Sequence, residues 1–65
     1  MSNAIKSLLA REENKLKRQI DNHEATKLEQ EVLGDTAVVR AKLERQEEAM
    51  KVTRANIKKL KAKLQ

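Results

Sequence analysis

Basic side chains are the residues of this chain with the clearest chemical use, and they gather at its C-terminal end. Residues 1–33 hold six basic and six acidic side chains, so residues 34–65 account for the whole net charge of +5. From residue 51 onward the only charged residues are Lys51, Arg54, Lys58, Lys59, Lys61 and Lys63. Clustered lysines and arginines bind phosphates of DNA or RNA by displacing counterions. The cluster predicts weak, salt-sensitive contact with nucleic acid, and the alternative is a solvated helix face.

Catalytic and metal-binding residue types do not form a recognisable constellation. Glu12 with Glu13 and Glu47 with Glu48 are adjacent pairs, whose members point in different directions on a helix. The chain has no cysteine nucleophile and no glycine-rich phosphate loop. His23 alone supplies too few ligands for zinc, and we interpret it as a tolerated polar position, with a pH-sensitive layer as the alternative. The sequence therefore predicts no enzyme, no catalytic residue, no cofactor and no metal site.

An apolar repeat in the second half of the chain predicts the element that positions the basic residues. Its members are spaced alternately by four and three, with Val32 one heptad earlier: Val39, Leu43, Gln46, Met50, Thr53, Ile57, Leu60 and Leu64. A sustained spacing of 3.5 keeps residues on one seam only if the helix supercoils with a partner. Ile57 and Leu60 at successive seam positions favour two strands. The predicted fold is all-α, a single long helix forming a parallel two-stranded coiled coil, and thus a homodimer.

The first half of the chain continues this seam less regularly. Residues 1–3 are interpreted as a tail or an expression remnant, and residues 4–64 as the coiled-coil helix with an irregular stretch at about 21–35. Ile5, Leu9, Leu16 and Ile20 share a face, but Glu13 lies between them and the rhythm falters after Ile20. Steps of four then restore the later register, as in a phase shift that unwinds a supercoil. The predicted dimer interface is Leu9, Leu16, Ile20, Leu28, Val32, Val39, Leu43, Met50, Ile57, Leu60 and Leu64.

Gly34 and Asp35 form the one plausible break in the helix. A hairpin would use Gly34 as a C-terminal cap and Asp35 as the N-cap of a second helix. A continuous helix would carry an interior glycine at a cost of about 1 kcal/mol relative to alanine. Continuity is favoured because parallel strands would pair Asp35 with Arg40 and Lys42 with Glu47. The continuous helix would be a rod of roughly 90 Å at about 1.5 Å per residue.

The stretch from Gly34 to Leu43 resembles the coiled coil of the ATR-interacting protein family, partner subunits of the ATR-type checkpoint kinase. The residues that carry the resemblance are Gly34, Asp35, Val38, Val39, Arg40 and Leu43. The resemblance implies dimerisation of a kinase regulatory subunit in the DNA-damage checkpoint, an unbroken helix at Gly34 and a nuclear location. It also implies a checkpoint kinase and replication protein A as partners, bound by regions outside this chain.

The predicted function is a homodimerisation module of a larger protein that holds two copies of its flanking regions together. The alternatives are a basic helical element that contacts nucleic acid, and a helical hairpin or strand of a hetero-complex. No apolar run approaches the roughly 18 residues of a membrane span, so no membrane contact is expected. An intracellular, nuclear location is expected, since Lys58 to Lys61 is similar to a nuclear-import signal.

Overall fold

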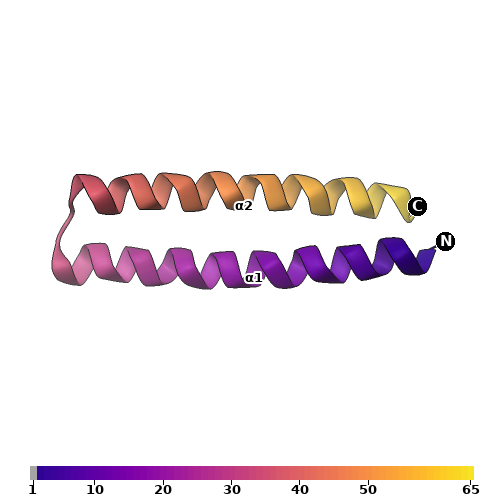
Figure 1. Cartoon of the computed structure of the whole chain (residues 1–65), viewed down its shortest axis with the longest axis horizontal. Helices are drawn as coiled ribbons and strands as arrows, with labels where there is room; N and C mark the ends of the chain where they lie inside the picture. The colour runs from indigo at the N-terminus through magenta and orange to yellow at the C-terminus, as the bar shows by residue number, and fades with distance from the viewer. Residues whose placement is uncertain (1) are drawn as a thin grey trace.

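Two antiparallel helices make up the part of the chain that the computed structural model describes, residues 2–65 (Figure 1). Helix α1 runs over Ser2–Leu33 and helix α2 over Ala37–Lys63, and the two pack along their length. The Cα atoms span 49 × 14 × 13 Å. The prediction of a single long helix in a parallel two-stranded coiled coil is therefore wrong. The fold is all-α, but both strands belong to one chain and run in opposite directions.

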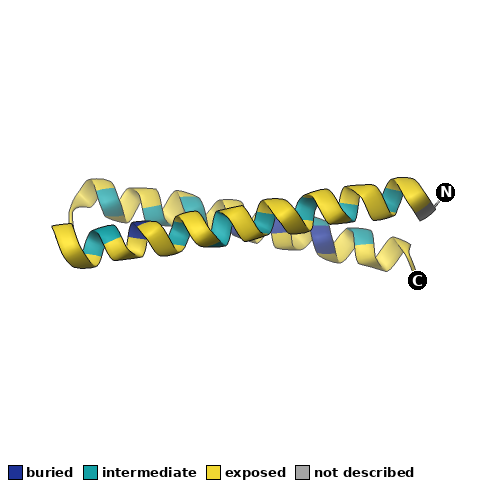
Figure 2. Cartoon of the chain, turned by 90° about the horizontal axis from the view of Figure 1, so that it is seen from below, coloured by how far each residue is buried: buried dark blue, intermediate teal, exposed yellow. Residues whose placement is uncertain are grey.

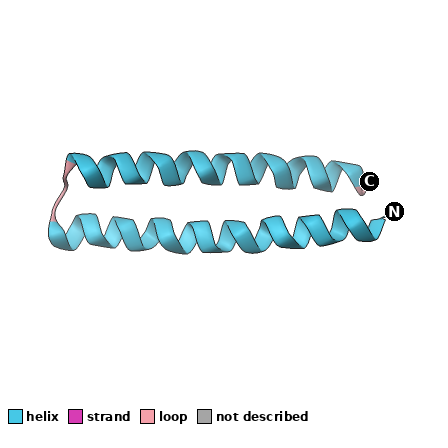
Figure 3. Cartoon of the chain, viewed as in Figure 1, coloured by secondary structure: helices cyan, strands magenta, loops and turns pink. Residues whose placement is uncertain are grey.

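The turn between the helices is built by Gly34, Asp35 and Thr36 (Figure 3). Gly34 has a φ of 108°, and its N–H donates to the carbonyl of Gln30 at 3.0 Å. This is the left-handed cap that ends many helices, and glycine takes it without a Cβ clash. Thr36 caps α2, because its Oγ1 accepts from the Val39 N–H at 3.2 Å. The unbroken helix implied by the family resemblance is thus absent at this position.

Asp35 fastens the turn to both helices. Its carboxylate accepts a hydrogen bond from Gln30 Nε2 at 2.9 Å and another from Arg40 Nη1 at 2.9 Å. These bonds, that of Gln30 first and that of Arg40 second, lower the pKa of Asp35 below its ordinary value of 3.8. The pairing expected between parallel strands therefore forms within one chain. Lys42 instead pairs with Glu29 of α1 at 3.8 Å.

The interface between the helices follows an unbroken four-three spacing on α1. Its buried and half-buried members are Ile5, Leu9, Glu12, Leu16, Gln19, His23, Thr26 and Gln30. The phase shift expected after Ile20 is absent from these positions. The helix turns Gln19, His23 and Thr26 toward α2, while Ile20 lies half-buried beside them and Leu28 is left exposed. The part of the α1 seam from Gln19 to Gln30 is consequently polar, so the spacing of apolar residues does not reveal it.

The interface on α2 follows the seam predicted from the apolar repeat. Val39, Leu43, Gln46 and Leu60 are half-buried, while Met50, Thr53 and Ile57 are buried. Figure 2 shows the less exposed residues lining the sides of the helices that face each other. The core is one side chain deep on each helix, so little apolar surface leaves water. Within residues 2–65 neither helix has the length and apolar character required to cross a membrane.

Candidate interaction surfaces

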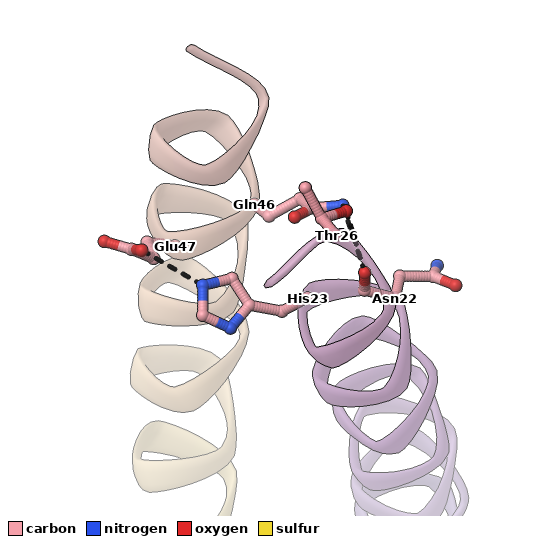
Figure 4. A network of polar contacts seen from close by, with 5 residues as sticks. All are labelled: Asn22, His23, Thr26, Gln46 and Glu47. Carbon is pink, nitrogen blue, oxygen red and sulfur yellow. Dashed lines mark hydrogen bonds and ion pairs between the residues drawn. The ribbon is translucent and has the colours of Figure 1, made fainter. Parts of the chain in front are cut away.

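A polar layer crosses the middle of the hairpin (Figure 4). Gln46 Nε2 donates to Thr26 Oγ1 at 2.9 Å, and Thr26 Oγ1 donates to the Asn22 carbonyl at 3.0 Å. On the other side of the layer, His23 Nε2 donates to Glu47 Oε2 at 3.0 Å. His23 is thus a half-buried residue with a carboxylate partner on the facing helix. The bonds of Gln46 with Thr26 and of His23 with Glu47 join fixed positions of the two helices and so disfavour slipped registers.

A second polar layer lies nearer to the chain ends. Asn56 Nδ2 donates to Glu12 Oε1 at 3.1 Å, and the buried Thr53 hydroxyl donates to the Ala49 carbonyl at 3.1 Å. Among the described residues, the buried amide oxygens of Gln19 and Gln46 have no hydrogen-bond partner. Since each net hydrogen bond contributes only about 1 kcal/mol and an unmade one costs more, these layers specify the pairing without stabilising it strongly.

In residues 2–65, no three His, Asp or Glu side chains come together as a set of metal ligands. Glu12 accepts a hydrogen bond from Asn56, and Glu47 accepts one from His23. These two carboxylates therefore pair the helices with each other.

One broad side of the hairpin, which we name the groove face, holds two shallow grooves between the helices. One groove of about 270 Å³ is lined by Leu8, Glu12, Asn56, Lys59 and Leu60. The other, of about 340 Å³, is lined by Asn22, Ala25, Thr26, Glu29, Lys42 and Gln46. Residues seven apart share a helix face, which extends this side along both helices. We define the groove face as Ala4, Leu8, Arg11, Lys15, Arg18, Asn22, Ala25, Glu29, Val32, Val38, Lys42, Arg45, Ala49, Val52, Asn56, Lys59 and Lys63.

Of the seven large hydrophobic residues with high exposure in the described part of the chain, four lie on the groove face. Leu8 is 48% exposed, Val52 52%, Val32 70% and Val38 75%. The other large hydrophobic residues with high exposure are Leu28, on the outer edge of α1, and Leu33 and Leu64, at helix ends. Large apolar side chains on one side of a narrow helical pair are typical of a surface that binds another helix.

The opposite face, on the other side of the seam, is almost entirely charged. We define it as Lys6, Ala10, Glu13, Lys17, Ile20, Glu24, Lys27, Glu31, Arg40, Glu44, Glu47, Lys51, Arg54, Lys58 and Lys61. None of the large hydrophobic residues with high exposure belongs to it. A groove of about 470 Å³ opens on this side, lined by Arg54, Ile57, Lys58, Lys61, Ala62 and Gln65. This face is suited to charged partners rather than to apolar ones.

The antiparallel fold also separates charge along its length. The half that contains the chain ends, residues 2–18 and 51–65, holds eleven basic and two acidic side chains, a net charge of +9. The half next to the turn, residues 19–50, holds four basic and eight acidic side chains, a net charge of −4. The basic half is named the open half. Sequence reasoning missed the basic residues that α1 adds to the open half, because the net charge was summed over residues 1–33, where it is zero. The charge of residues 2–18 alone shows five cations: Lys6, Arg11, Lys15, Lys17 and Arg18.

The residues predicted to form a dimer interface divide into two groups. Those buried or half-buried within one chain are Leu9, Leu16, Ile20, Val39, Leu43, Met50, Ile57 and Leu60. Those left exposed are Leu28, Val32 and Leu64. The predicted basic residues also divide, since Lys59 and Lys63 lie on the groove face and Lys51, Arg54, Lys58 and Lys61 on the opposite face.

Comparison with protein-family models, with curated proteins and with solved structures finds no match to the chain.

Proposed function

We propose that this hairpin is a protein-interaction module that receives one amphipathic helix of a partner protein on its groove face, completing a three-helix bundle. The observation that carries this proposal is the gathering of Leu8, Val32, Val38 and Val52 on one side. A third helix laid along the hairpin would cover these side chains together with the two grooves between α1 and α2. At about 25 cal/mol per Å² of apolar surface, this burial drives the association.

Charge decides between a different partner and a second copy of the chain. The groove face carries seven basic residues and a single acidic one, Glu29: Arg11, Lys15, Arg18, Lys42, Arg45, Lys59 and Lys63. Two copies meeting through this face would bring fourteen basic side chains against two acidic ones. Juxtaposed like charges cost several kcal/mol and suppress wrong partners. The face therefore favours a helix with leucine-like side chains along its centre and glutamates or aspartates along its edges.

The test uses a synthetic helical peptide with leucines on its seam and glutamates beside them. We expect isothermal titration to show binding to the wild-type chain and much weaker binding of a matched peptide in which lysines replace the glutamates. Replacing Leu8 and Val52 together with glutamine removes two apolar contacts and should weaken binding by at least about tenfold, since 1.4 kcal/mol corresponds to tenfold.

The matched control replaces Leu28 and Leu33 with glutamine, because both are exposed but lie off the groove face. This control variant should bind the acidic peptide like the wild type. Sedimentation equilibrium of the chain alone should give the mass of one copy. Equal loss in both double variants, or a stable two-copy mass at micromolar concentration, would contradict the proposal, and the second result would restore the homodimer.

A further inference from the structure

We propose that the open half of the opposite face binds the sugar–phosphate backbone of double-stranded nucleic acid without reading its sequence. The site is the groove of about 470 Å³ at the C-terminal end of α2. Three cations, Arg54, Lys58 and Lys61, line this groove together with the buried Ile57. The remaining lining residues are Ala62 and Gln65. The groove thus presents positive charge with no carboxylate in its lining.

Helix α1 adds cations beside this groove because the chain doubles back on itself. Lys6 and Lys17 of α1 belong to the same face, and Lys51 extends the row on α2. All six cations are exposed, and none takes part in an ion pair among the described residues. Glu13 is the single acidic residue of this half of the face. The resulting surface has a net charge of +5 from six cations and one carboxylate.

The dimensions of the array suit a regular polyanion. The ten residue steps from Lys51 to Lys61 span about 15 Å at about 1.5 Å per residue. The axes of packed helices lie about 8–10 Å apart, so the array is two rows wide. A strand of duplex DNA carries one phosphate per about 3.4 Å of axis, and about four phosphates therefore lie within reach of one row. Without an aromatic residue to stack on bases, recognition stops at the backbone.

A membrane surface is the competing anionic partner, and the distribution of apolar residues disfavours it. Helices that lie in a lipid interface bury a large apolar face beneath their cations. Here Leu8, Val32, Val38 and Val52 lie on the groove face, on the other side of the hairpin from this array. The six cations lie outside the groove face. One chain would therefore hold a partner helix on the groove face and a nucleic acid on the opposite face.

The experiment measures binding of the chain to a labelled duplex of about 20 base pairs by fluorescence anisotropy at several salt concentrations. With about four phosphate contacts, the slope of log affinity against log salt should be about −3.6. Affinity should then fall about 100-fold between about 50 mM and about 200 mM salt. Replacing Arg54, Lys58 and Lys61 with glutamine should flatten the slope by about three. Duplexes of unrelated sequence should bind equally.

The matched control removes three charges from the same half but from the groove face: Arg11→Gln, Lys15→Gln and Lys59→Gln. This variant should keep a slope within about one unit of the wild type. Circular dichroism of both triple variants should show the same helix content as the wild type. Equal flattening in the two triple variants would overturn the assignment to the opposite face. Tighter binding to vesicles of phosphatidylserine and phosphatidylcholine in equal parts than to the duplex, lost in the first variant, would overturn nucleic acid as the ligand.

Discussion

Replacing Gly34 with alanine tests the turn on which the antiparallel fold depends. Gly34 has a φ of 108°, and a Cβ built there meets no atom within 4 Å. The cost of Gly34→Ala is therefore backbone strain alone, about 1–2 kcal/mol for an L-residue forced into a left-handed conformation. For a domain of this size, 1 kcal/mol lowers the melting temperature by about 4–8 °C. We expect the variant to melt about 4–16 °C below the wild type.

The assay is thermal and urea unfolding followed by far-ultraviolet circular dichroism. Gly34→Asn is the graded control, because asparagine tolerates positive φ better than alanine and should lose less stability. The sign of the change in melting temperature on Gly34→Ala distinguishes a turn at Gly34 from a continuous helix. In a continuous helix, alanine would be more favourable than glycine by about 1 kcal/mol, so the melting temperature would rise. A variant as stable as the wild type, or more stable, would refute the turn at Gly34.

Two further predictions concern the core and the turn. Ile57→Ala truncates one of the two apolar side chains that are buried in the described part of the chain. It should destabilise the hairpin by about 2–5 kcal/mol, enough to lose most helix at room temperature. Val52→Ala on the groove face should change stability by no more than about 0.5 kcal/mol in the same melting experiment. Helix content unchanged in Ile57→Ala would mean that this residue is not in the core. The lowered pKa of Asp35 predicts stability that is present above its ordinary value of 3.8 and lost as pH falls through the lower pKa of the folded state. Melting temperatures of the wild type should therefore drop toward those of Asp35→Asn between about pH 5 and pH 2, and parallel curves for the two proteins would contradict the hydrogen bonds drawn to this carboxylate.

The sequence predicted one of the two helix faces well. On α2, the spacing from Val39 through Leu43, Met50, Ile57 and Leu60 identifies the residues that meet a partner helix, since apolar side chains repeating every 3.5 residues must be covered. The same repeat does not identify the helix that covers these side chains. A second copy and an earlier segment of the same chain satisfy it equally, and the single long helix in a parallel coiled coil was the wrong choice between them.

Only the C-terminal part of the basic surface was predicted from the sequence, for a related reason. The C-terminal cations stand out along the sequence, whereas those between Lys6 and Arg18 are offset by distant carboxylates such as Glu29 and Glu31. Only the reversal at the turn brings the two basic segments together and carries the acidic residues away. Surface charge depends on which segments share an end of the fold, and charge summed along a sequence does not contain that information.

The polar residues of the seam could have distinguished a hairpin from a parallel dimer. In a parallel dimer each would meet its own copy, so Glu12 would face Glu12 of the partner, two like charges on a buried seam. In the hairpin Glu12 meets Asn56, Thr26 meets Gln46, and the numbers of each pair sum to about 70, placing the centre of the pairing near residue 35. A hairpin also avoids the association cost of about 4–15 kcal/mol that a dimer bears. Complementary polar residues on either side of the turn therefore favour the reversal, and Gly34, the glycine with φ above zero, lies next to the centre of their pairing.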